Sequence, residues 1–216
     1  MNTTFNMKEI ERKAFRSTYQ DGLWDIYYGL IVVSLAIFMH RPESGYSWVN
    51  IASMTLIFAM TYGLLFAGKK FITAPRLGNV VFGETRKRKK RTMSIILAIL
   101  ISLQVLLLFV TGLGWLYTPF NQLFGQLVGG RSEFLFVSLI GAAMVCTGMS
   151  IIAFFTDFMR GYYISFLMSL AVFLMLYINE PVIPILIGVL IILPGLFLLV
   201  RFLRKYPRIS MEQEHE

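Results

Sequence analysis

Residues 86–116 read RKRKKRTMSIILAILISLQVLLLFVTGLGWL, a block of six cations followed almost directly by an uncharged apolar run. The apolar part, residues 93–116, would form a helix about 36 Å long at a rise of about 1.5 Å per residue. Because the hydrocarbon core of a bilayer is about 30 Å thick, this helix is long enough to cross it. Lys and Arg are enriched in the cytoplasmic connections of membrane proteins. The stretch therefore predicts a membrane-spanning helix that starts at the cytoplasmic face.

The composition of the whole chain also favours a membrane protein. The 216 residues are 56% hydrophobic and 15% charged, with a mean hydropathy of +0.67. A soluble domain of this length needs a more polar surface. Residues 1–20 are polar and contain no apolar signal segment, so we expect the first apolar run to stay in the mature protein. The only cysteine, Cys146, lies inside an apolar run, which excludes an intramolecular disulfide.

Six apolar runs predict an all-α, polytopic membrane bundle of six transmembrane helices in one domain. The expected spans are 23–40, 50–67, 93–116, 132–155, 161–179 and 181–200. The remaining segments are expected to be an amphipathic N-terminal segment at 1–22, a basic loop at 68–92 and a tail at 201–216, all three cytoplasmic.

The distribution of basic residues predicts the orientation of this bundle. Eighteen of the twenty Lys and Arg residues fall on the side of the N-terminus, and only Arg41 and Arg131 fall on the other side. Positively charged connections stay in the cytoplasm. We therefore expect a protein of the cell membrane with both termini in the cytoplasm.

A possible internal repeat relates the first hairpin to the last. Gly63 and Pro75 recur as Gly195 and Pro207, each 132 positions later. Spans 1–2 and 5–6 would then be duplicated hairpins in the same orientation. Apolar sequence of low complexity also produces such matches by chance, so both interpretations stay open.

Small residues at every fourth position predict close helix packing. They occur on the second and fourth spans, as Thr55, Ala59, Gly63 and Ala67, and as Ser138 and Ala142. Small side chains let helix backbones approach closely in a membrane, whereas contact with lipid gains nothing from them. We expect these residues to pack within the bundle or, if one stripe faces outward, against a second copy or another membrane protein.

Polar side chains at membrane depth are candidate functional residues, because burying them in hydrocarbon is costly. The candidates are Asp25, Gln104 and Glu133. We expect Asp25 to pair with Arg16 or Arg160 rather than to hold a proton or a cation. Gln104 lies near the middle of its span, where an interhelical hydrogen bond is favoured over a transport pathway.

No catalytic, cofactor-binding or metal site is predicted. His40 and His215 fall on opposite faces of the membrane, and Cys146 has no histidine at a compatible depth. Metal and nucleophile chemistry need such groups together. P-loop, zinc-protease and nucleophile-elbow motifs are absent from the sequence. We interpret the chain as a non-enzymatic packing or partner-binding protein without a cofactor. The alternatives are a small transporter or channel, and a membrane enzyme that acts on lipids.

The basic run predicts contact with anionic lipids. Its members are Arg86, Lys87, Arg88, Lys89, Lys90 and Arg91. Each basic residue near an anionic leaflet contributes about 1 kcal/mol, and six exceed what orientation requires. Nucleic acid is not expected as a partner, because the run lies close to the bilayer and contains no interleaved aromatic residues for base stacking.

Two segments carry a resemblance to a known family. They read DGLWDIYYG at 21–29 and APRLGNVVFGETRKRKK at 74–90. These resemble motifs of a family of small, uncharacterised, multi-pass prokaryotic membrane proteins. The resemblance covers the first hairpin and the connection after it, and it implies a prokaryotic inner membrane. It carries over no functional residue, since the family has no known activity.

Overall fold

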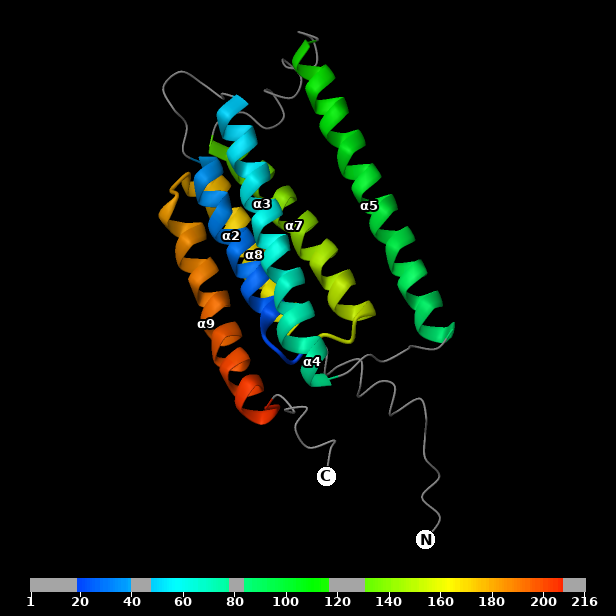
Figure 1. Ribbon diagram of the computed structural model, residues 1–216. Coiled ribbons are helices and arrows are strands. Elements are labelled where there is room, and N and C mark those ends of the chain that lie inside the picture. Colours follow the sequence, from blue (N-terminus) through cyan, green and yellow to red (C-terminus); the bar gives the residue numbers. More distant parts are fainter. Residues whose placement is uncertain (1–18, 40–47, 78–83, 117–130, 208–216) are drawn as a thin grey trace, which may run out of the picture. The chain divides into compact units, whose positions relative to one another are not determined.

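The computed structural model describes residues 19–39, 48–77, 84–116 and 131–207, and the regular structure in these ranges is helical. These ranges contain six long helices (Figure 1): α2 (Leu23–Met39), α3 (Trp48–Gly68), α5 (Glu84–Leu116), α7 (Arg131–Phe155), α8 (Met159–Ile178) and α9 (Val182–Lys205). A π-helical turn, η1 (Lys69–Thr73), and the short α4 (Ala74–Leu77) continue α3. The all-α class is therefore confirmed, and each predicted span falls on one long helix.

Four segments among the described residues are long and apolar enough to cross a membrane. They are Thr55–Arg76, Val137–Phe155, Met159–Ile178 and Val182–Lys205. A shorter apolar helix covers Leu23–Ala36. Large apolar side chains such as Phe154 and Phe197 are exposed on the surfaces of these helices, where lipid rather than water would surround them. These helices indicate a multi-pass membrane protein.

The chain divides into two compact units. The first unit contains residues 1–82 and 184–216, and thus α2, α3, η1, α4 and nearly all of α9. The second unit contains residues 83–183, and thus α5, α7 and α8.

In the first unit, α2 and α9 cross with their backbones in contact. A Cβ atom added to Gly29 would lie 2.8 Å from the carbonyl oxygen of Gly188, and one added to Gly188 would lie 2.8 Å from the carbonyl oxygen of Gly29. Gly22, which directly precedes α2, and Gly195 of α9 approach each other in the same way, seven positions from Gly29 and from Gly188. Because no side chain fits at these distances, the crossing requires glycine on both helices.

In the second unit, α7 and α8 form an antiparallel hairpin that packs through small residues. The Ser165 hydroxyl donates to the carbonyl oxygen of Cys146 at 2.9 Å, and it lies 3.0 Å from the Ser150 hydroxyl. A Cβ atom added to Gly161 would lie 2.7 Å from the Cβ atom of Ala153. Ser138, from the predicted stripe on α7, is fully buried, and Ala142 is half-buried.

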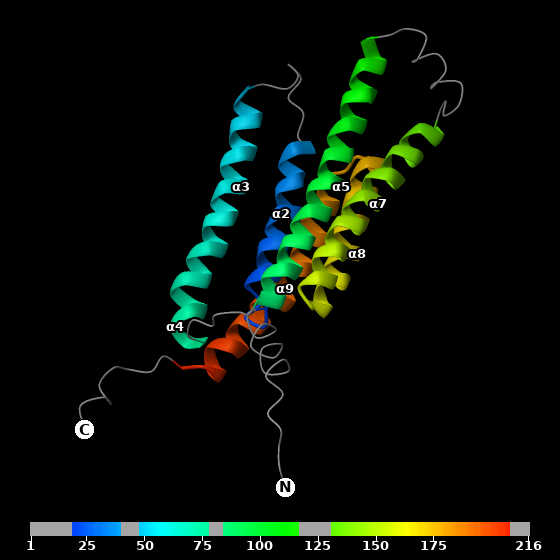
Figure 2. The same ribbon diagram turned by 90° about the vertical axis from the view of Figure 1, so that its right-hand side faces the viewer.

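The connection that the sequence predicts as a loop over residues 68–92 is instead largely helical. It contains η1 and α4, and α5 begins already at Glu84. Figure 2 shows α5 as one continuous helix, whose 33 residues correspond to about 50 Å. The physical reason is that Lys, Arg and Glu are good helix formers, so the charged run continues the helix of the apolar run instead of ending it.

The small-residue stripe of α3 has a different environment from the glycines of α2 and α9. Thr55 and Ala59 are exposed, and Ala67 is half-buried. A Cβ atom added to Gly63 meets no atom within 4 Å. Among the described residues the stripe therefore does not bring another helix close at Gly63, and its packing against a second copy stays a prediction. Gly63 also differs from buried Gly195, although the proposed repeat makes these two positions equivalent.

Candidate functional site

The first unit holds a fully buried carboxylate, Asp21, immediately before α2. The Lys69 ammonium lies 2.6 Å from its Oδ2 atom, and the Thr73 hydroxyl donates to the same oxygen at 2.6 Å. The backbone N–H of Leu23 donates to Oδ1 at 3.2 Å. The Asp21 side chain has no exposed surface, whereas 21% of the Lys69 side chain is exposed. The carboxylate is therefore compensated in charge and bonded through both oxygens, as a buried ion requires.

Unusual backbone conformations on both partner segments place these groups around the Asp21 carboxylate. Lys69 and Thr73 are the first and last residues of η1, and the π-helical turn brings both side chains to one oxygen. Single π-helical turns are rare in proteins and occur frequently at functional sites. On the other side, Gly22 adopts a φ of 74°, which favours glycine and turns the chain so that the Leu23 N–H faces Asp21.

Aromatic rings lie beside the ion pair. The ring of Trp24 stacks on Tyr19 and on Tyr28, with centroid distances of 5.7 Å and 5.8 Å. Tyr27 meets Trp24 edge-on at 5.8 Å. The Lys69 ammonium lies 6.0 Å from the centroid of Trp24, within the range of a cation–π interaction. Trp and Tyr at a helix end are typical of the membrane–water interface.

Asp25, the acidic residue that the sequence singles out, is also buried, with 3% of its surface exposed. It lies on the face of α2 that meets Gly195. Its predicted pairing with Arg16 or Arg160 stays a prediction. Arg16 lies outside the described residues, and Arg160 belongs to the second unit, where its guanidinium carbon lies 5.3 Å from the centroid of Phe158. The ion pair between Asp21 and Lys69, in contrast, was not predicted from the sequence.

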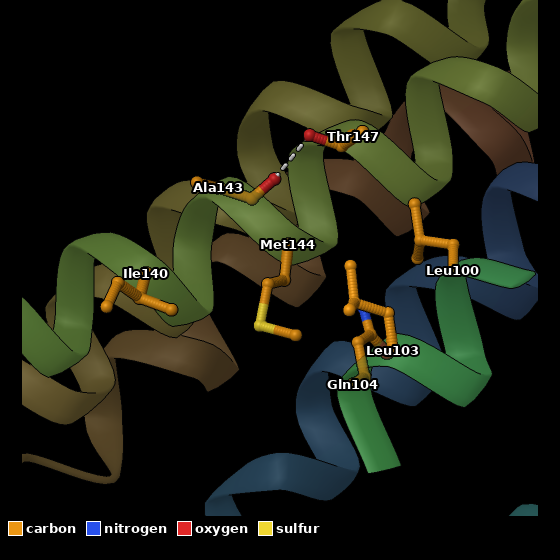
Figure 3. A pocket seen from close by; sticks show the side chains of 7 residues that line it. All are labelled: Leu100, Leu103, Gln104, Ile140, Ala143, Met144 and Thr147. Carbon is orange, nitrogen blue, oxygen red and sulfur yellow. Dashed lines mark hydrogen bonds between the residues drawn. The ribbon is translucent and has the colours of Figure 1, made fainter. Parts of the chain in front are cut away.

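Gln104 lines a pocket of about 270 Å³ between α5 and α7 in the second unit (Figure 3). The lining residues are Leu100, Leu103, Gln104, Ile140, Ala143, Met144 and Thr147. The Thr147 hydroxyl donates to the carbonyl oxygen of Ala143 at 2.8 Å, so its proton is used within α7. The pocket is mainly apolar, whereas a transport pathway through Gln104 requires a polar one. Glu133 lies in the first turn of α7, and its side chain is outside the described part of the structure.

The basic run lies on the first turns of α5. Its described side chains, Lys87, Arg88, Lys89, Lys90 and Arg91, are all exposed, and we call them the basic collar. Arg86 belongs to the same turn, but its side chain is outside the described part. Successive residues of an α-helix are rotated by about 100°, so five of them pass around the whole circumference. The collar is therefore positive on every side, and the N-terminal end of the helix dipole adds to its attraction for anions.

The comparisons with known proteins assign no family to the chain. Neither a family model, nor a curated protein, nor a solved structure matches it. The resemblance of residues 21–29 and 74–90 is therefore not supported by a family match. In the described ranges, no group of three or more His, Cys, Asp or Glu side chains could hold a metal ion. What the helices do indicate is a multi-pass membrane protein.

Proposed function

We propose that the chain is a non-enzymatic protein of the cell membrane, with six spans and both termini in the cytoplasm, that binds anionic phospholipid at its basic collar. The observation that carries this proposal is the position of the collar. It lies on a helix that continues without interruption into the apolar part of α5.

The rigid helix holds the collar at the depth of the lipid phosphates. The Thr92 hydroxyl donates to the carbonyl oxygen of Arg88 at 3.1 Å, and the exposed apolar side chains begin at Ile95. Arg91 and Ile95 are four positions apart, or about 6 Å along the axis. The cations consequently lie at the boundary between apolar surface and water, where the headgroups are. A charge on a flexible loop would spend much of its time further away, where salt screens it beyond about 10 Å.

A second argument comes from the absence of a preferred face. A groove that binds nucleic acid or a protein partner requires charge on one side of the helix, whereas lipid headgroups surround a spanning helix at every angle. Five consecutive exposed cations match the second arrangement. Their mutual repulsion, together with the unfavourable helix dipole, is relieved when anions lie between them.

Replacing Arg88, Lys89 and Lys90 together by Gln should lower the amount of co-purifying phosphatidylglycerol or cardiolipin by about tenfold, since three contributions of about 1 kcal/mol are lost and reduced repulsion offsets part of them. The measurement is mass spectrometry of lipids retained by the protein after purification in a mild detergent. High salt should produce a similar loss from the unchanged protein, because screening weakens exposed charges.

The matched control keeps the charge and changes the side chains, as Arg88→Lys with Lys89→Arg and Lys90→Arg. It should retain the lipid. If the Gln variant retains as much anionic lipid as the control, the basic collar has no lipid-binding role and serves only as an orientation signal.

The proposed orientation predicts a labelling pattern. In a Cys146→Ala background, single cysteines at Ser47 and Asn121 should react with a membrane-impermeant maleimide added to intact cells. A cysteine at Thr85, next to the collar, should react only after the membrane is opened. External labelling at Thr85 would contradict the six-span arrangement.

A further inference from the structure

Helix α5 carries the basic collar and also forms one wall of the pocket of Figure 3, so both features belong to the second unit. Leu100 is nine positions after Arg91, and Gln104 is thirteen positions after it, which corresponds to about 14 Å and about 20 Å along the axis of α5. One leaflet contributes about 15 Å to the hydrocarbon core of a bilayer. A lipid whose phosphate lies at the collar therefore has acyl chains that reach the depth of the pocket.

The walls of the pocket have the chemistry of a site for a hydrocarbon chain. Leu100 and Leu103 of α5 face Ile140 and Met144 of α7 across it (Figure 3). Leu103 is 55% exposed and Ile140 is 41% exposed, so the pocket is open rather than enclosed. An open apolar pocket at this depth disfavours a charged or strongly hydrated occupant, because five of its seven lining side chains offer no hydrogen-bond partner to replace the lost hydration.

We propose that this pocket holds the distal half of one acyl chain of the anionic phospholipid whose phosphate lies at the basic collar. The proposal rests on the proposed function, because the collar selects which lipid enters. The argument for this occupant is charge complementarity at one end of α5 and apolar complementarity further along the same helix. A lipid held at both points is retained longer than one held at the headgroup alone.

The test uses the full-length protein in phosphatidylcholine nanodiscs that contain a trace of photoreactive lipid. One probe is phosphatidylglycerol with a diazirine in the distal half of an acyl chain, and the other is phosphatidylcholine with the same chain. After irradiation, peptide mass spectrometry locates the adducts. With the phosphatidylglycerol probe, adducts on Leu100, Ile140 or Met144 should exceed those of the phosphatidylcholine probe by about fivefold or more, as a charge-selected lipid requires.

Filling the pocket should remove these adducts. Ala143→Trp places a large ring in the pocket from α7, and Leu103→Trp does so from α5, so one variant remains if the other fails to fold. Ala98→Trp is the matched control, because Ala98 is exposed on α5 and does not line the pocket. The control should keep the adducts. The two filled variants should lose them while still retaining more phosphatidylglycerol than the triple Gln variant of the collar.

The outcomes separate this inference from the function on which it rests. If the collar variant keeps its phosphatidylglycerol and no probe shows headgroup preference, the proposed function fails and the inference fails with it. If lipid retention depends on the collar but adducts spread evenly over the exposed helices, or persist in both filled variants, only the inference is wrong. Equal labelling of the pocket by the two probes also overturns it, because the collar then does not select the lipid that enters.

Discussion

Replacing Gly188 by Ala should destabilise the protein by about 1–3 kcal/mol, whereas replacing Gly63 by Ala should leave it unchanged or slightly more stable. An added Cβ at Gly188 lies 2.5 Å from a Val33 side-chain carbon and 2.8 Å from the carbonyl oxygen of Gly29. Since one of these atoms is backbone, α2 and α9 have to separate. The helical position of Gly63 has open space around it, so Ala gains helix propensity at no steric cost. Unfolding in mixed micelles with increasing dodecyl sulfate measures both effects.

The same measurement on Gly29→Ala, and on the variant that combines it with Gly188→Ala, tests whether the contact between these two glycines causes the loss of stability. Gly29 and Gly188 meet each other, so the two effects should not add: once the helices have separated, the second methyl group costs less. Equal destabilisation by the substitutions at Gly63 and Gly188 would show that the crossing of α2 and α9 is not the close contact described here.

Lys69→Met should destabilise the protein by about 3–5 kcal/mol, which is the usual result of removing one member of a buried ion pair. Among the described residues, the variant leaves the fully buried Asp21 carboxylate with the Thr73 hydroxyl and the backbone N–H of Leu23 as partners. Lys70→Met is the matched control, since Lys70 is the next residue of the same π-helical turn and is exposed. It should change stability by less than about 1 kcal/mol.

Combining Lys69→Met with Asp21→Asn should recover part of the loss, because the uncompensated charge is then removed. The readout is again unfolding in mixed micelles. If Lys69→Met and Lys70→Met have the same effect, the contact between Asp21 and Lys69 contributes no more than an exposed pair. If the double variant is worse than Lys69→Met alone, the unpaired charge is not the cause of the loss.

The positions of the helices could be predicted from sequence because they follow from the length of the apolar runs. Spans predicted at 161–179 and 181–200 correspond to Met159–Ile178 and Val182–Lys205. The largest differences are the start of α5, at Glu84 rather than near residue 93, and the continuation of α3 through η1 and α4 to Leu77. Hydropathy detects where a helix enters lipid, but it says nothing about a helix that continues into water through residues with high helix propensity.

The contacts between helices could not be predicted in the same way. Small residues on α3 indicate that a backbone can approach, but they do not say which helix approaches it, and Gly63 has no near neighbour in the described part of the chain. A sequence signal for the true crossing existed. Gly188 and Gly195 are seven positions apart on one face of α9, and Gly22 and Gly29 have the same spacing at the start of α2.

The ion pair had a weaker signal. Asp21 and Lys69 are 48 positions apart in the sequence. The spacing of apolar residues predicts where helices lie, but it does not predict which helix ends meet. The sequence KKFIT does not predict the π-helical turn that aligns Lys69 with Thr73, because the same residues are equally compatible with an α-helix. The presence of buried Asp21 as a partner favours the wider turn, and that partner is known only from the structure.

The discontinuous first unit has a consequence for biosynthesis. Its helices α2 and α3 leave the ribosome first and α9 leaves it last, whereas the second unit is encoded by the uninterrupted stretch 83–183. Contacts between distant parts of a chain form slowly, and domains normally complete in the order of their synthesis. Here Gly22 and Gly29 cannot contact Gly195 and Gly188 until translation is nearly finished. The middle of the chain is thus able to fold before its two ends meet, and during that interval Asp25 of α2 is not yet covered by Gly195 of α9.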